Sequence, residues 1–560
     1  MTFSRAILVI LCAGAVLFLA APLLEAESAV PLPRETGRHW LYLSQDNRFP
    51  GEIESAQSQL SQSISTSSLS RRSRSLGYAR AIRQCDLAPA ENRLEAIRST
   101  VCEIIYIARY INAVSVRGSA AELSLAEQLP FVERITPVRA FYAHLDEPAD
   151  ALEKDLPQIN LEPEDYGYSW AQNVQVNLLA AHERGYFGEG VIIGLQDTGF
   201  DNLEHNCFAS LDVIAAYDFV NDDPDVSNEG DMGNGSHGTR TLSVIAALDT
   251  GRFIGGAPAA RFVLTKTENT DWEQPIEEDA WIAGLWFQDS CGTNVLSSSL
   301  SYTDWYEYSD YDGVTAPITR AADSAAVAGM VIVTSAGNDG RQDYPLNKIG
   351  VPGDGFYVVA AGGVISDSSY WTGSSQGPSF DGRIKPDVSA LGTNVYVANN
   401  ATMTEYFGRN GTSYSCPLIA SICALVLQAN PDLTALQVMD ILHSTASMAD
   451  APDTLMGYGI PDALAAVIMA EGMAVADAPP LPEAWHFDVY PNPFNSVVRL
   501  SIPQMMPVVA IEILDVDGRL LRRCDRNARS LEFRGFPAGV YFIRVENFRA
   551  TAVRRVMLVR

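Results

Sequence analysis

The stretch Ile193-Gly194-Leu195-Gln196-Asp197-Thr198-Gly199-Phe200 places an aspartate at the end of an apolar run. The run begins at Val191 and is rich in β-branched residues, which favours a buried strand. An aspartate that directly follows such a strand stands at its carboxyl end, where functional groups of open parallel sheets gather. The stretch therefore predicts a parallel sheet with Asp197 as a candidate functional residue.

Further apolar runs alternate with helical stretches from about residue 165 to residue 470. We expect strands at 191–193, 261–264, 295–299, 331–333 and 357–360, and helices at 239–248, 277–289, 317–328 and 415–428. Strands that are apolar throughout imply a parallel sheet covered on both faces by helices. This region therefore predicts an α/β domain over 165–470.

Asp-Thr-Gly also occurs in pepsin-like proteases, where two such aspartates activate water. The chain has a second copy at Asp249-Thr250-Gly251. Asp249 follows a helix-like run rather than a strand, and it follows Asp197 too closely for the two to occupy separate, equivalent lobes. The pepsin-like interpretation is therefore weak.

A histidine and a serine in distinctive settings follow Asp197 along the chain. His237 lies in Gly-Ser-His-Gly-Thr-Arg at 235–240, and Ser413 lies in Gly-Thr-Ser-Tyr-Ser-Cys-Pro at 411–417. A serine hydroxyl needs a base to take its proton, and the imidazole needs a carboxylate to fix its tautomer. The apolar helix after Ser413 would add its positive dipole end near a developing oxyanion.

With these motifs, residues 165–470 resemble the subtilase family of serine proteases. The resemblance rests on the order Asp, His, Ser, on the two motifs above, and on Ser-Ala-Gly-Asn-Asp at 335–339. It implies a subtilisin-like fold and a secreted serine endopeptidase that cleaves polypeptides through an acyl-enzyme. A non-catalytic surface binding protein on a protease scaffold is the alternative.

The resemblance also implies a role for each motif residue. Asp197 would orient the base, His237 would act as general base and then general acid, and Ser413 would be the nucleophile. Asn338 would donate to the oxyanion together with the backbone N–H of Ser413. Arg240 stands where a second histidine is common and Tyr414 where methionine is common, so we expect altered packing or subsite shape there.

Two further features are implied by the same family. Ser299, Leu300 and Ser301 resemble the strand that pairs with an extended substrate, and Gly337 would help to form the pocket wall. Acidic residues at 221–225 and 229–231 suggest either a structural calcium site or a solvated loop, and their spacing is not that of an EF-hand. The chemistry itself requires no cofactor.

Residues 1–26 read as a secretory signal peptide, with Arg5 ahead of an uncharged apolar run and Ala26 at the cleavage point. A retained membrane anchor is the alternative. The signal predicts that the protein is secreted or displayed at the cell surface.

Residues 27–160 form a separate region with a strand, strand, helix, strand pattern over 103–135. They stand where a subtilase propeptide would, and 112–138 resembles its ferredoxin-like inhibitory fold. This α+β unit would assist folding and act as an intramolecular inhibitor, with an ordinary accessory domain as the alternative. The polar tract Ser55–Ser75 is expected to be a solvated loop.

Residues 471–485 read as a Pro/Ala linker, and 486–560 alternate like a small C-terminal β-sandwich. Three segments of this region, 489–495, 537–542 and 554–560, resemble a type IX secretion sorting domain. The type IX secretion machinery is then the expected partner. A β-sandwich that binds substrate or carbohydrate is the alternative.

Charge and cysteine content exclude some classes of protein. The net charge of −29 argues against nucleic acid as a main partner. The cysteines are too scattered for a metal-ligand pattern or a dense disulfide framework, although Cys207 and Cys291 could pair after export.

Overall fold

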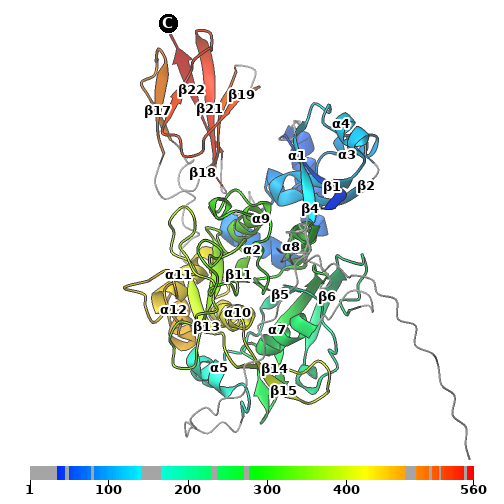
Figure 1. Cartoon of the computed structure of the whole chain (residues 1–560), viewed down its shortest axis with the longest axis vertical. Coiled ribbons are helices and arrows are strands. Elements are labelled where there is room, and N and C mark those ends of the chain that lie inside the picture. Colours follow the sequence, from blue (N-terminus) through cyan, green and yellow to red (C-terminus); the bar gives the residue numbers. More distant parts are fainter. Residues whose placement is uncertain are drawn as a thin grey trace, which may run out of the picture.

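A seven-stranded parallel sheet forms the centre of the molecule, in the order β13-β12-β11-β10-β5-β9-β6 (Figure 1). Its strands are β5 Ile192–Asp197, β6 Asp212–Asp218, β9 Arg261–Lys266, β10 Val295–Ser298, β11 Val331–Ser335, β12 Val358–Val364 and β13 Val388–Leu391. The inner strands are buried along their whole length, as expected of a parallel sheet covered on both faces. The predicted α/β fold is confirmed.

Helices cover both faces of this sheet. The helices of this unit are α5 Trp170–Gln175, α6 Leu178–Glu183, α7 Ser236–Ala246, α8 Ile276–Cys291, α9 Pro317–Val327, α10 Thr412–Ala429, α11 Ala435–Thr445 and α12 Ala463–Gly472. α7 and α10 pack on one face in the largest apolar core, whereas α8 and α9 pack on the other. The short pairs β7 Leu248–Asp249 with β8 Phe253–Ile254, and β14 Val395–Ala398 with β15 Tyr406–Arg409, complete the unit.

The structure is a computed structural model that describes residues 34–44, 50–76, 81–101, 103–140, 165–228, 236–269, 276–473, 487–502, 508–515, 519–547 and 551–559. The signal peptide predicted at 1–26 and most of the linker predicted at 471–485 lie outside these residues. Within the described residues, α10 is the one helix long and apolar enough to cross a membrane, and it is buried in the central core.

The N-terminal unit is an antiparallel sheet of order β2-β3-β1-β4. Its elements are β1 Arg34–Leu43, α1 Pro50–Ser63, α2 Thr66–Leu76, α3 Glu91–Arg98, β2 Glu103–Ala108, β3 Ala113–Arg117, α4 Ala120–Ala126 and β4 Val132–Ala140. Side chains alternate across the sheet. Leu41 and Val114 face α3 and α4, whereas Trp40 and Ala113 join the core made by α8 and α9.

The polar tract Ser55–Ser75 is not a solvated loop, and that prediction was wrong. It forms most of α1 and α2, and Arg71 and Arg72 within it are 3% and 0% exposed. Charged side chains are buried in this way when they are paired. Both arginines pair with Asp289 of α8, which lies far away in the chain.

The C-terminal unit consists of two small antiparallel sheets, as predicted (Figure 1). Its strands are β16 Asp488–Tyr490, β17 Val497–Ser501, β18 Val508–Leu514, β19 Leu520–Cys524, β20 Ser530–Glu532, β21 Gly539–Asn547 and β22 Thr551–Leu558. Its apolar core contains residues of this unit alone. The ion pairs that join it to the rest of the described chain are Arg523–Glu133 and Arg526–Asp312.

The suggested disulfide between Cys207 and Cys291 is absent, because both thiols are free. The Cys207 thiol contacts His205 instead, at 3.1 Å from Nδ1, and Cys291 ends α8.

Candidate active site

Asp197 is the last residue of β5, and only 1% of it is exposed. Its Oδ1 accepts a hydrogen bond from the N–H of Thr198 at 2.8 Å, and its Oδ2 accepts one from Thr241 Oγ1 at 3.0 Å. A buried carboxylate is tolerated only when such donors replace water. These bonds fix the plane of the carboxylate and leave it aimed at a third donor.

His237 is that donor. It lies in the first turn of α7, and its Nδ1 is 2.7 Å from Asp197 Oδ1. An ionised carboxylate can only accept, so Nδ1 carries the proton and Nε2 is left as the basic nitrogen. The adjacent Gly238 permits this approach, because a Cβ there would lie 2.2 Å from the carbonyl oxygen of Gly199.

Ser413 lies in the first turn of α10, directly after Thr412, the residue with which that helix begins. It is 7% exposed, and N–H groups in the first turn of a helix have no intrahelical acceptor. The ring of Tyr414, the next residue, is 6.0 Å from the ring of His237. The histidine and the start of α10 therefore face one another.

Asn338 follows β11 and is held against the same helix start. Its Oδ1 accepts from the N–H of Thr412 at 2.9 Å and from Thr412 Oγ1 at 3.1 Å. These two bonds hold the Asn338 amide against the residue that directly precedes Ser413. The structure thus brings all four residues singled out from the sequence to the carboxyl edge of the sheet.

Two residues support this site in roles that the sequence did not indicate: Thr241 was not predicted at all, and Ser299 was predicted only as a substrate-binding residue. Thr241 donates to Asp197, and Ser299 Oγ donates to the carbonyl oxygen of Ser413 at 2.8 Å. Thr241 follows His237 by one helical turn, and residues at that spacing share a helix face. That spacing was the available signal for Thr241, whereas nothing local to Ser299 indicates its contact.

The predicted substrate-binding residues lie just beyond β10. Leu300 is buried and its carbonyl oxygen accepts from Thr334 Oγ1, while Ser301 Oγ is buried with no hydrogen-bond partner in the described residues. Gly337 has φ +100°, and a Cβ there would lie 2.8 Å from Ser375 Oγ and 3.6 Å from Ser301 Oγ. Gly337 and Ser301 are therefore neighbours, although Ser299 and Leu300 contact protein groups.

Burial also sets the charge state of groups around the site. The pKa of Glu268 is raised to about 7, chiefly because the side chain is buried and also because of the nearby charge of Asp197. Tyr302 donates to this carboxyl group at 2.5 Å. A buried carboxyl group with a raised pKa therefore lies near Asp197.

The described half of the acidic loop is satisfied by protein groups. Asp222 accepts from the Tyr217 hydroxyl at 2.5 Å, Asp223 accepts from the N–H of Asp225 at 2.8 Å, and Asp225 accepts from Ser227 Oγ at 2.7 Å. Residues 229–231 lie outside the described part of the chain. Within the described residues there is no group of three His, Cys, Asp or Glu side chains that could hold a metal ion.

Comparison with known proteins assigns three regions of the chain to protein families. Residues 188–459 match the Subtilase family, residues 38–151 match the Peptidase S8 propeptide domain of Bacteroidota, and residues 488–559 match the Secretion system C-terminal sorting domain. The sorting domain implies secretion or display at the cell surface.

Individual relatives are similar over the central unit. Subtilisin DY from Bacillus licheniformis is 32% identical over 265 residues, which cover 47% of this chain and 86% of that protein. Subtilisin E from Bacillus subtilis is 29% identical over 318 residues, covering 55% and 76%. A solved structure of proteases from Pseudoalteromonas arctica has 24% identity and a TM-score of 0.45, covering 55% of this chain and 99% of its own. The chain belongs to the subtilase family and is a subtilisin-like serine endopeptidase with a propeptide domain and a secretion sorting domain.

Proposed function

We propose that Asp197, His237, Ser413 and Asn338 are the catalytic residues of this endopeptidase. The observation that carries the proposal is the 2.7 Å bond from His237 Nδ1 to the buried Asp197, which leaves Nε2 as the basic nitrogen of a ring that lies 6.0 Å from the ring of Tyr414 in the first turn of α10. The position of Ser413 in the first turn of α10 and the amide of Asn338 beside it support the rest.

In the proposed reaction, His237 Nε2 takes the proton of the Ser413 hydroxyl as its oxygen attacks the substrate carbonyl carbon. Asp197 stabilises the imidazolium that forms, and the developing oxyanion accepts from Asn338 Nδ2 and from the N–H of Ser413. The imidazolium then protonates the leaving amine, and the acyl-enzyme remains. Water activated by His237 completes the hydrolysis.

A serine-directed fluorophosphonate tests the nucleophile. The Ser413→Ala variant should lose both labelling and casein hydrolysis. Ser415→Ala is a matched control on the same helix, because the Ser415 hydroxyl donates to the Thr412 carbonyl, and it should keep both. Labelling that persists in Ser413→Ala, or casein hydrolysis that resists phenylmethylsulfonyl fluoride, would reject the assignment.

We further propose that extended polypeptides bind along Ser299, Leu300 and Ser301, with Gly337 in the pocket wall. The unpartnered hydroxyl of Ser301 next to Gly337 supports this, because a substrate backbone could supply the missing partner. A Gly337→Ala substitution should raise KM for peptide substrates, and an unchanged KM would contradict the placement.

For the remaining regions we propose a signal peptide at 1–26, a propeptide at 27–160 that inhibits its own catalytic domain at 165–470, a linker at 471–485 and a sorting domain at 486–560. The expected partner of the sorting domain is the type IX secretion machinery. Deletion of 486–560 should abolish export and leave protease activity inside the cell, whereas normal export would reject the sorting role.

A structural calcium at 221–231 would show as a chelator-induced fall in Tm.

A further inference from the structure

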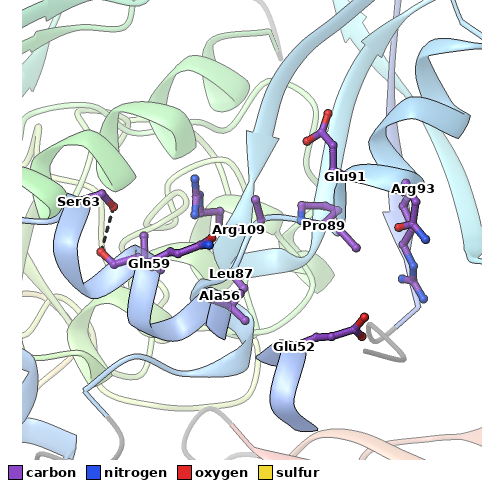
Figure 2. A pocket seen from close by; sticks show the side chains of 13 residues that line it. Glu52, Ala56, Gln59, Ser63, Leu87, Pro89, Glu91, Arg93 and Arg109 are labelled. Carbon is purple, nitrogen blue, oxygen red and sulfur yellow. Dashed lines mark hydrogen bonds between the residues drawn. The ribbon is translucent and has the colours of Figure 1, made fainter. Parts of the chain in front are cut away.

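The helices α1 and α2 lie between β1 and α3 and take no part in the core of the N-terminal sheet. The order β1-α3-β2-β3-α4-β4 already makes a complete two-layer unit, and its core contains no residue of α1 or α2. A hollow of about 840 Å³ lies between α1 and residues 88–93 of the same unit, and Leu60 and Leu87 meet at its wall (Figure 2). Residues 50–76 and 81–87, here termed the arm, therefore contribute nothing to the apolar core of the sheet.

The arm packs on the catalytic domain instead. Leu60 and Ile64 cluster with Trp286 of α8, and Leu76 of α2 clusters with Val327 and Ala328 at the end of α9. Two glycines lie under α2 where these helices end. A Cβ on Gly292 would lie 2.6 Å from Ser65 Oγ, and one on Gly329 would lie 2.3 Å from Ser75 Oγ. The arm is thus in close contact with the carboxyl ends of both helices.

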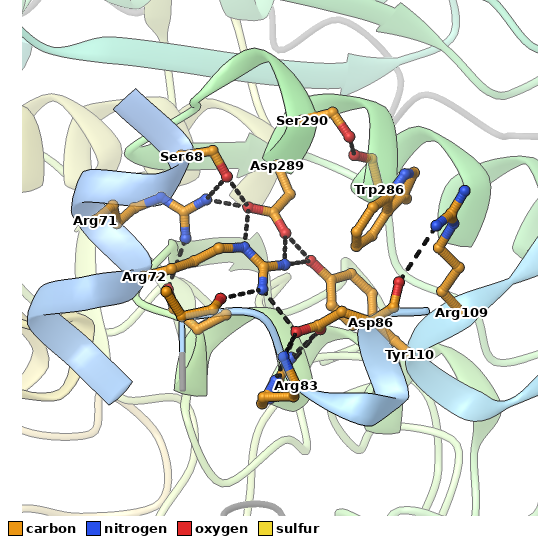
Figure 3. A network of polar contacts seen from close by, with 12 residues as sticks. Ser68, Arg71, Arg72, Arg83, Asp86, Arg109, Tyr110, Trp286, Asp289 and Ser290 are labelled. Carbon is orange, nitrogen blue, oxygen red and sulfur yellow. Dashed lines mark hydrogen bonds and ion pairs between the residues drawn. The ribbon is translucent and has the colours of Figure 1, made fainter. Parts of the chain in front are cut away.

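Two buried arginines of α2 make the polar contacts of this interface (Figure 3). Arg71 and Arg72 both donate to Asp289 of α8, which also accepts from Ser68 Oγ at 3.1 Å. Arg71 Nη1 donates to the carbonyl oxygen of Ala328 at 2.9 Å. Cations at the carboxyl ends of helices are favoured by the helix dipole, so α8 and α9 both contribute to the attraction.

Asp289 of α8 and the two arginines of the arm can be buried only as a pair, because each compensates the charge of the other. Asp289 is 1% exposed, and burial alone would raise its pKa, but Arg72 and Arg71 outweigh that effect and hold the pKa well below its usual range. Arg72 is bound on its other edge by Asp86 of the arm at 2.8 Å, and Tyr110, in the turn that joins β2 to β3, also donates to Asp289. Asp289 is therefore the point where the arm, the sheet and the catalytic domain meet.

We propose that the arm is a clasp, a second docking element that binds the ends of α8 and α9 through Arg71 and Arg72 on Asp289 and retains the propeptide after the chain is cleaved. The clasp lies on α8 and α9, which cover the face of the sheet opposite α10 and Ser413. Its strength therefore sets how long the protease stays latent after cleavage. This proposal rests on the inhibitory role proposed for residues 27–160.

The first experiment needs no catalysis. In the full-length Ser413→Ala chain, which stays intact, hydrogen exchange is measured with and without Arg71→Gln, a change confined to the arm. Removal of one partner from a buried ion pair is costly, so the amides of α2 should exchange at least about tenfold faster. Amides of α3 should be unaffected.

Two results would overturn the clasp in this experiment. Unchanged exchange in α2 would mean that other contacts hold the arm, and equal acceleration in α2 and α3 would mean that Arg71 only supports the N-terminal unit as a whole. Arg98→Gln is the control, because Arg98 pairs with Glu91 in an exposed position on α3, and it should leave α2 unchanged.

The second experiment uses the active full-length chain and follows the delay between propeptide cleavage and the onset of casein hydrolysis. Arg71→Gln and Asp289→Asn should each shorten this delay at least about tenfold, and the double variant should shorten it little further, because both remove one interaction. An unchanged delay, or fully additive effects, would overturn the proposal. If the chain proves inactive towards casein, only the proposed function fails, and hydrogen exchange still decides the clasp.

Discussion

Two buried aspartates organise this molecule, and they are built differently. Asp197 is surrounded by neutral donors, Thr198 N–H and Thr241, and by one histidine that can change its charge. Asp289 is surrounded by two arginines, which keep their charge at any physiological pH. Each carboxylate is 1% exposed, so the difference lies in the partners and not in burial.

The difference in partners corresponds to a difference in use. A carboxylate that orients a titratable imidazole can assist a proton transfer, because the proton on the distant nitrogen can come and go. A carboxylate held between two permanent cations cannot take part in such a step, but it makes an interface that resists mild acid. Replacement of each aspartate by asparagine should therefore have opposite effects. At Asp197 it should lower protease activity, whereas at Asp289 it should bring the onset of activity forward.

Asp197→Asn should have the largest effect. The amide removes the fixed tautomer of His237, and turnover of a peptide substrate, after the propeptide is removed in trans, should fall by about 10⁴-fold. Exchange of the α2 amides should stay at the parent rate, because the hydrogen-bond partners described for the Asp197 side chain all lie in the catalytic domain. Loss of protection in α2 would show that the two aspartates are not independent.

Asn338→Leu should lower turnover by about 10²–10³-fold, the loss that follows removal of an oxyanion donor in subtilisins. Asn338→Asp separates the donor from the acceptor, because the new carboxylate can still accept from Thr412 but cannot donate. Both variants should lose kcat, and Asn338→Asp should keep the parent Tm. Full activity in either variant would contradict the assignment of Asn338.

The first aspartate could be predicted from the sequence and the second could not. Asp197 ends an apolar strand. His237 and Ser413 lie in short motifs that contain glycine, a residue that lets another part of the backbone come close. Asp289 lies in a helix without any motif, and its partners Arg71 and Arg72 lie in a Ser-rich tract typical of a loop. Their burial depends on a contact between segments far apart in the chain, which no local pattern encodes.

Strands too were predicted only where the local sequence carries a clear pattern. The five strands predicted in the catalytic domain are inner or central members of the sheet, where continuous apolar runs are required. The two that were not predicted, β6 and β13, are its edges. β6 is partly exposed and carries polar residues, and β13 has only four residues, so neither shows a strong signal.

Asp279 of α8 extends the comparison to pH, because it contacts Ser115 and Arg38 of the N-terminal unit. Its pKa is raised to about 7, mainly by burial, and Arg38 opposes this only in part. When the propeptide leaves, water reaches Asp279 and its pKa should fall towards 3.8. At a pH between these two values, Asp279 is protonated while the propeptide is bound and ionised after the propeptide leaves.

Propeptide retention should therefore be strongest in mild acid and should weaken as the pH rises from about 4 to about 7. The expected loss is about tenfold in affinity for each unit by which release lowers the pKa of Asp279. Dissociation of the cleaved propeptide measured across this range would show the slope. Asp279→Asn should flatten it, and a slope that survives that substitution would assign the effect to another group.

Thr241→Val should have the smallest effect on turnover. It tests how much the hydrogen bond from Thr241 to Asp197 contributes to the orientation of the carboxylate. The variant keeps the side-chain volume and removes the hydroxyl that donates to Asp197 Oδ2. A hydrogen bond to a charged group contributes about 1.5 kcal/mol or more, so kcat should fall at least about tenfold. Because the carboxylate loses a donor that stabilises its charge, the acidic limb of the pH profile of kcat/KM should also move. Thr241→Ser keeps the donor and should restore both properties, whereas a fall in Tm with an unchanged pH profile would mean that Thr241 only packs.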